Sequence, residues 1–358
     1  MIRLFPLPAE GKRLGAVAIA VASIALLSAA SRERGSGAAL GEVADTLRDP
    51  ALRTGTLANG LRYYVRANAS PRGRAELRLV VNAGSILEDD DQRGMAHFLE
   101  HMAFNGTRHF PHQSLIDFVE ASGMRFGADL NAYTSYDETV YKLTVPTDDA
   151  RFLERGLTVL EDWASGGIVL DSAEVVAERG VVLGEWRSRL PDTASQTIQR
   201  HQLEVFFGSG SRYLDRLPIG LPELLDSATR APIARFYNDW YRLDLMAVVV
   251  VGDIDPAAVE REVRERFGKI ARAKKPRARR EARVDAAADG VVDVERAQLT
   301  PSVQVLWPVP EPARGARARV ERQLVEELLL QSLQQRFLHM RELDSRPFVA
   351  ANVQRGSV

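Results

Sequence analysis

Apolar and polar residues alternate with a period of two in several short segments, and this pattern predicts strands. Residues 61–66 follow Asn59-Gly60, a strong turn signal, so a strand entered from a hairpin is expected there. Residues 76–81 pass from alternation into a continuous apolar run, which is typical of a mostly buried strand. Further strands are predicted at 138–145, 245–251 and 302–307.

Helices are predicted between these strands, where apolar residues recur at intervals of three and four. The predicted helices span 94–105, 112–122, 149–165, 172–190 and 256–267, and a longer amphipathic helix is expected at 318–343. This order of elements predicts the α+β fold class, with helices packed on a mainly antiparallel sheet. At 358 residues, the chain is long enough for two domains.

The N-terminus has the order of a secretory signal peptide. Three basic residues precede an apolar run at 14–27, and small residues follow at 28–30. The run is shorter than the about 20 residues that span a membrane. Residues 1–30 are therefore predicted to be a signal peptide, with an uncleaved anchor as the alternative. Either a signal peptide or an anchor would export the chain. Contact with a membrane is expected only through this N-terminal segment.

Changes in composition divide the rest of the chain. Residues 31–48 are predicted to be a linker and 49–270 an N-terminal domain that carries the chemistry. Seven basic residues at 271–283 mark a solvated basic linker, 271–298; a nucleic-acid patch is the alternative, but no aromatic residues interleave and the net charge is −1. Residues 299–358 resemble a partial second α+β domain, so the chain is expected to be a fragment.

The candidate chemistry lies in one predicted helix. The chain has no cysteine, so a metal would have to bind His, Asp or Glu. His97 and His101 are four residues apart and share a helix face, where both could bind one ion. Glu100 could accept a proton from an activated water without ligating the metal. This His-x-x-Glu-His order is the inverted zinc-peptidase motif; two histidines packed in a helix beside a surface Glu are the alternative.

A zinc site of this kind needs a third protein ligand. Glu178 and Glu185 are seven residues apart in the next candidate helix and share one face. One could ligate zinc and the other could orient a histidine, and the spacing alone does not choose between them. The other four histidines lie in a predicted surface loop or on polar helical stretches: His109, His112, His201 and His339.

Three segments resemble the signature of the pitrilysin/insulinase family of zinc peptidases. They are residues 97–107, residues 130–141 and residues 178–187, in the family's order. The resemblance covers roughly residues 50 to 270 and is greatest to long bacterial members exported to the periplasm. It implies a zinc metalloendopeptidase with one Zn²⁺ per active site, located in the periplasm.

The resemblance also implies roles for single residues. The second Glu of the family's pair ligates zinc, which makes Glu185 the expected third ligand and Glu178 the supporting carboxylate. Asn131 and Ala132 match the edge segment on which an extended substrate adds as a strand. The sequence departs from the short family members in one respect: its gap from His101 to Glu185 is several residues longer, so that Glu178 is nearer the usual spacing.

The expected substrate is a peptide or unfolded polypeptide, and nucleic acid is not expected as a partner. Family members enclose substrate between paired domains, so a further C-terminal half or a partner subunit is expected. An Arg/Tyr pair that the later half would supply cannot be located in this sequence. The alternatives are a non-catalytic family member that acts as a scaffold or processing-complex subunit, and a metal-dependent hydrolase of other substrates. The intact motif residues argue against the first.

Overall fold

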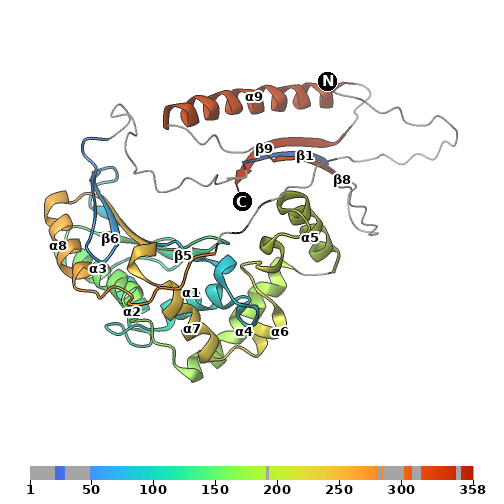
Figure 1. The fold of residues 1–358 in the computed structure, drawn as a ribbon. Helices are drawn as coiled ribbons and strands as arrows, with labels where there is room; N and C mark the ends of the chain where they lie inside the picture. The colour runs from blue at the N-terminus through green and yellow to red at the C-terminus, as the bar shows by residue number, and fades with distance from the viewer. Residues whose placement is uncertain are drawn as a thin grey trace. The chain divides into compact units, whose positions relative to one another are not determined.

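The computed structural model describes residues 21–28, 49–190, 193–280, 282, 284, 302–308, 316–343 and 348–357. The chain divides into two compact units, Ala44–Val292 and a second unit made of Met1–Val43 with Asp293–Val358. Figure 1 labels their helices and some of their strands. The linker predicted at 31–48 lies outside the described residues, as does most of the predicted signal peptide.

A six-stranded sheet forms the centre of the unit Ala44–Val292, in the order β2-β3-β7-β4-β6-β5. Strands β3 and β7 pair parallel and the other four neighbouring pairs are antiparallel, which confirms the mainly antiparallel sheet. Two of these strands, β2 and β5, were not predicted from the residue pattern, although the family resemblance implied an edge segment at Asn131 and Ala132. The bounds are β2 Arg53–Thr56, β3 Arg62–Ala67, β4 Arg74–Val81, β5 Leu130–Thr134, β6 Thr139–Pro146 and β7 Met246–Gly252.

Eight α-helices are described in this unit, and the five predicted there are confirmed to within two residues at each end. Helices α5, α6 and α7 were not predicted, although Ile233, Phe236, Tyr237 and Trp240 give α7 a buried stripe at helical spacing. The bounds are α1 Met95–Asn105, α2 Ser114–Ala121, α3 Ala150–Ala164, α4 Ser172–Arg189, α5 Thr193–Phe207, α6 Pro222–Asp226, α7 Arg230–Trp240 and α8 Pro256–Gly268.

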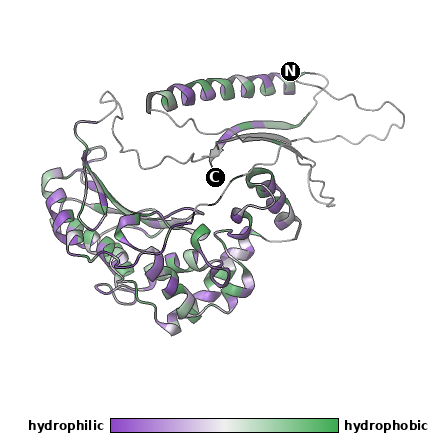
Figure 2. Cartoon of the chain, viewed as in Figure 1, coloured by the Kyte–Doolittle hydropathy of each residue, from purple (hydrophilic) through white to green (hydrophobic). Residues whose placement is uncertain are grey.

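The core lies between the sheet and its helices. Alternate residues of β4 are buried, and α3 packs on β4 and β6 while α8 packs on β3. The helices carry hydrophobic and hydrophilic residues in turn along their length, as expected of elements with one buried face (Figure 2). Burial of these apolar faces is the main stabilising contribution to the unit.

The second unit contains a three-stranded sheet in the order β8-β1-β9, with both pairs parallel. Strand β8, Ser302–Pro308, and helix α9, Ala316–Glu342, confirm the strand and helix predicted there, and β9 spans Ala350–Ser357. Strand β1, Val21–Ser28, is part of the apolar run from which the signal peptide is predicted. No helix among the described residues has the length and hydropathy needed to cross a membrane.

Candidate metal centre and active site

Helix α1 carries the His-x-x-Glu-His residues and lies among β5, α4 and α7 (Figure 1). Gly94 precedes it with φ 98°, in the left-handed region that glycine favours. A Cβ at Gly94 would lie 2.9 Å from the Cα of Gly220 and 2.9 Å from Leu225 Cδ2. The close approach of the loop that contains Gly220 therefore requires glycine at this helix start.

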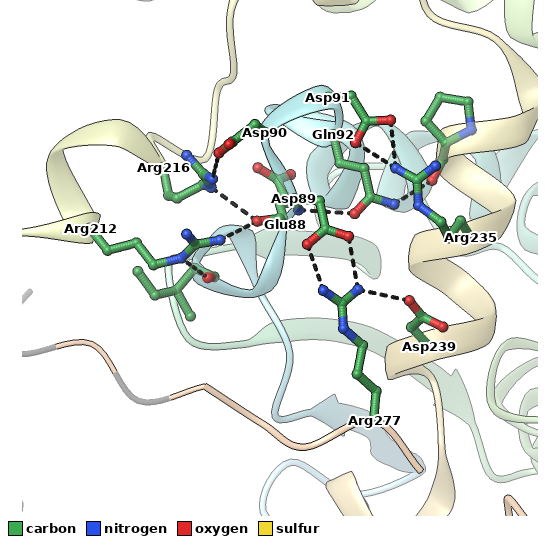
Figure 3. A network of polar contacts seen from close by, with 12 residues as sticks. Glu88, Asp89, Asp90, Asp91, Gln92, Arg212, Arg216, Arg235, Asp239 and Arg277 are labelled. Atoms are coloured by element: carbon green, nitrogen blue, oxygen red, sulfur yellow. Dashed lines mark hydrogen bonds and ion pairs between the residues drawn. The ribbon is translucent and has the colours of Figure 1, made fainter. Parts of the chain in front are cut away.

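A fully buried carboxylate holds the first turn of α1. Glu88 accepts hydrogen bonds from the backbone N–H of Gly94 at 3.1 Å and of Ala96 at 2.8 Å. These are N–H groups that the helix itself leaves unpaired. Burial raises the pKa of Glu88 to about 8, although the two N–H donors act in the opposite direction. Arg212 and Arg216 donate to its backbone carbonyl (Figure 3). Glu88 is therefore bound to α1 through its side chain and to the two arginines through its backbone.

His97, His101 and Glu185 bring their ligand atoms together within 4.8 Å of one another. His97 Nε2 lies 3.6 Å and His101 Nε2 lies 3.3 Å from the same oxygen, Glu185 Oε2. The centroids of the two imidazole rings are 4.7 Å apart, and the ring planes are nearly perpendicular. Helix α4 supplies the carboxylate of Glu185. One face of α4 carries residues at spacings of three and four, namely Val175, Glu178, Val182 and Glu185. The two valines are buried, so the two glutamates lie on the same side of the helix as its packed face.

These distances fit a zinc ion. Zinc binds His nitrogen and carboxylate oxygen at about 2.0–2.2 Å, and a tetrahedral arrangement then separates the ligand atoms by about 3.3 Å. Two nitrogens and one oxygen are donors that zinc accepts in catalytic sites, where a fourth position remains for water or substrate. Glu185 also forms an ion pair with Arg189 on the next turn of α4.

Glu178 contacts the ring nitrogen of His101 that does not face Glu185. Its Oε1 lies 2.8 Å from His101 Nδ1, and its Oε2 accepts from Asn105 Nδ2 at 2.8 Å. A proton on Nδ1 leaves the Nε2 lone pair directed toward Glu185. The geometry therefore places Glu185 with the two histidines and Glu178 behind one of them, which is the assignment that spacing alone left open.

The two histidines differ in their electrostatic environment. Burial, together with the charge of the neighbouring His101, lowers the pKa of His97 to about 4. For His101, burial also lowers the pKa, but its hydrogen bond with Glu178 and the charges of the surrounding carboxylates outweigh burial and raise it. His97 is therefore neutral at pH 7, which is the form in which imidazole binds a metal.

Glu100 lies outside this group of three, on the same helix and 7% exposed. Thr134 Oγ1, at the end of β5, donates to Glu100 Oε2 at 2.6 Å. Burial raises the pKa of Glu100, while the hydrogen bond from Thr134 acts in the opposite direction. A carboxyl group in this environment has its pKa moved toward neutrality, as suits a group that accepts and returns a proton.

Strand β5 forms an edge of the sheet. Asn131 is exposed and donates to the carbonyl of Gly127 at 3.1 Å, and its Oδ1 accepts from the Ala132 N–H at 2.8 Å. The N–H of Ala132 is thus held by the side chain beside it. An incoming strand would have to replace this bond to pair with Ala132.

The other three histidines of the unit Ala44–Val292 are not members of this group. His109 Nδ1 lies 2.7 Å from Asp162, a buried carboxylate that also accepts from Thr107, so this pair fastens the loop after α1. His112 is 82% exposed. His201 pairs with Glu204 on α5.

Sequence reasoning missed three residues that support the site: Glu88, Asn105 and Thr134. Asn105 could have been found, because it lies four residues after His101 on the same helix face. Thr134 shares a strand face with Ala132, another signal present in the sequence. Glu88 gave no local signal, since only the folded chain brings it to Gly94 and Ala96.

An α+β domain whose helix presents His-x-x-Glu-His to a downstream Glu has the arrangement of an inverted-motif zinc peptidase. Residues 63–213 match the insulinase family, peptidase family M16, and residues 227–342 match the domain described as the peptidase M16 inactive domain. The chain belongs to this family over these residues.

Several named relatives are similar to the chain. It is 42% identical over 211 residues to the probable zinc protease PqqL of Haemophilus influenzae, and 40% identical over 223 residues to PqqL of Escherichia coli. These matches cover 59% and 62% of this chain but only 22% and 24% of the relatives. The chain thus spans about a quarter of the length of these curated relatives.

Solved structures of proteases are also similar to the chain. The first half of the periplasmic protease PqqL from Escherichia coli superposes with a TM-score of 0.65 at 32% identity, covering 81% of this chain and 62% of that one. The ferredoxin protease FusC, in a mutant form bound to Arabidopsis ferredoxin, gives a TM-score of 0.58 at 30% identity, covering 64% of this chain and 25% of that one.

Proposed function

We propose that the chain carries the active site of an exported zinc-dependent endopeptidase. The observation that carries this proposal is the convergence of His97, His101 and Glu185, at distances that suit one tetrahedral ion, beside the buried carboxylate of Glu100. In this proposal the first three residues are the zinc ligands. Glu178 holds the tautomer and orientation of His101.

A zinc ion bound there supplies Lewis acidity, which lowers the pKa of water and polarises the scissile carbonyl. Glu100 accepts a proton from the attacking water and returns it to the leaving amine as the peptide bond breaks. Thr134 keeps the carboxylate of Glu100 in one orientation through its hydrogen bond. The surrounding burial excludes bulk water from this proton transfer.

The substrate proposed is a polypeptide in extended form. Strand β5 offers the geometry for it, because it is an edge strand and its last residue touches Glu100. Asn131 and Ala132 would then contact the substrate backbone. The ferredoxin complex of the similar protease FusC supports a protein substrate. The intact residue group favours this enzyme over a non-catalytic scaffold.

The direct test combines metal content with proteolysis. The purified chain is expected to bind one zinc ion per molecule by elemental analysis and, in a form competent for turnover, to cleave an internally quenched peptide. A chelator should remove both the metal and the cleavage, and added zinc should restore both. Cleavage that persists after the metal has been removed would contradict the proposal.

Export is proposed from the N-terminal order of basic, apolar and small residues. The similar PqqL of Escherichia coli is described as periplasmic. Cleavage after residue 30 would give a mature chain that begins near Ser31 and lacks β1. N-terminal sequencing of the protein recovered from the periplasm checks this; recovery of Met1 there would show an uncleaved anchor, and recovery only from the cytoplasm would refute export.

A further inference from the structure

Two arginines of the basic stretch after α8 are not in a solvated linker, in contrast to the prediction from composition. Arg277 and Arg279 are half-buried, while Ala278 and Arg280 beside them are exposed. This alternation is that of an extended segment with one face on the protein. Both side chains reach loops that adjoin the candidate active site.

Arg277 ties the loop before α1 to helix α7. Its guanidinium donates to both oxygens of Asp89, at 2.6 and 2.9 Å, and to Asp239 at 2.9 Å (Figure 3). It also lies over the ring of Trp240, 5.2 Å from its centroid. A two-pronged Arg–carboxylate contact fixes direction as well as distance. Asp89 directly follows Glu88, the residue that holds the first turn of α1.

Arg279 ties the end of β4 to the turn between β5 and β6. It donates to the carbonyl of Asn82 at 3.3 Å and to Asp137 Oδ1 at 3.0 Å. The other oxygen of Asp137 accepts from Tyr213 at 2.8 Å. The turn is thus held from two directions by side chains distant in sequence.

The two anchored segments also contact each other. The backbone N–H groups of Ser85 and Ile86 donate to the carbonyls of Ser135 and Tyr136, at 3.1 and 2.9 Å. Thr134, which bonds to Glu100, comes directly before this turn. Displacement of the turn would therefore shift the end of β5 relative to Glu100.

We propose that Arg277 and Arg279 are positioning residues for the active site. They fasten the segment 277–279 across the loop at 82–92 and the turn at 135–138, and so set the position of β5 against α1. The part of this proposal that concerns substrate rests on the proposed function; the part that concerns the position of β5 does not.

Hydrogen exchange measured by mass spectrometry tests the position of β5. Arg279→Ala is expected to speed exchange of peptides that cover residues 130–138 by about 2- to 5-fold, the effect of losing one partly exposed charged contact on a local opening. Peptides from α3 should be unchanged. Asp137→Asn should speed exchange of the same peptides, and the double variant should show less than the product of the two single accelerations, because Arg279 and Asp137 share one ion pair. Arg272→Ala, an exposed residue of the same stretch, is the matched control.

Unchanged exchange at 130–138 in Arg279→Ala would overturn the proposal, as would an equal acceleration in α3, which would indicate general destabilisation. If Arg279→Ala does not fold, Arg279→Lys, which keeps the charge but loses the planar fork, replaces it and should give a smaller acceleration at the same peptides.

The zinc content of the Arg279 variants should stay at the parent value. In a form that cleaves peptide, KM should rise severalfold with a smaller change in kcat. Absence of zinc from the parent chain, or cleavage that persists after the metal is removed, would refute the proposed function and leave the exchange result to decide the role of Arg279.

Discussion

Replacement of His97 or His101 by alanine should abolish stoichiometric zinc binding. Each substitution removes one of three protein ligands whose donor atoms lie within 4.8 Å of one another. Water cannot replace a nitrogen held in place by the helix, because it brings no preorganisation. The loss of affinity should exceed the roughly 10- to 100-fold expected when only a supporting carboxylate such as Glu178 is changed. Elemental analysis after dialysis, followed by titration with a competing chelator, measures the difference.

His112→Ala is the matched control for this experiment. His112 is on the loop that follows α1 and is 82% exposed, so its removal should leave zinc content at the parent value. Thermal unfolding of each variant in chelator separates loss of a ligand from loss of the fold. A stoichiometric zinc ion in either His97→Ala or His101→Ala would show that the metal site has been assigned to the wrong residues.

Glu100→Gln should keep zinc and lose turnover. The amide has the shape of the carboxylate and can still accept the hydrogen bond from Thr134, but it cannot take a proton from the attacking water. Turnover should fall by about 10²- to 10⁴-fold, the usual contribution of general acid–base catalysis, or about 3–5 kcal/mol in the barrier. The measurement is kcat on a quenched peptide beside the zinc content of the same sample, in the longest form of the protein that cleaves it.

Glu185→Gln provides the contrast, because it should lose zinc and turnover together. Glu178→Gln should be intermediate, since it weakens the orientation of His101 without removing a donor atom. The opposite pattern, in which Glu100→Gln releases zinc while Glu185→Gln retains it and still cleaves peptide, would reverse the assigned roles.

Local signals in the sequence were enough for much of the fold. The hairpin at Asn59-Gly60, the alternation at 76–81 and the helical spacing of 149–165 each arise from neighbours along the chain, and the structure has β3, β4 and α3 at these positions. Helix α7 was not predicted, and the edge segment at strand β5 was implied only by the family resemblance. Strand β5 is a short edge strand, and α7 owes its burial largely to α1 and the loop before it.

The sequence by itself determined that His97, Glu100 and His101 share one helix, because the 3.6-residue period places residues four apart on one face. It also placed Glu178 and Glu185 on one face of a second helix, and left open which of them would meet the histidines. Only the tertiary structure decided this, since the packing of α1 on α4 brings Glu185 to the Nε2 atoms and Glu178 to Nδ1 of His101. The contacts of Glu88, Arg277 and Arg279 likewise came from the fold alone: their partners lie between 6 and 197 residues away along the chain, and no periodicity relates residues that meet only when separate elements pack.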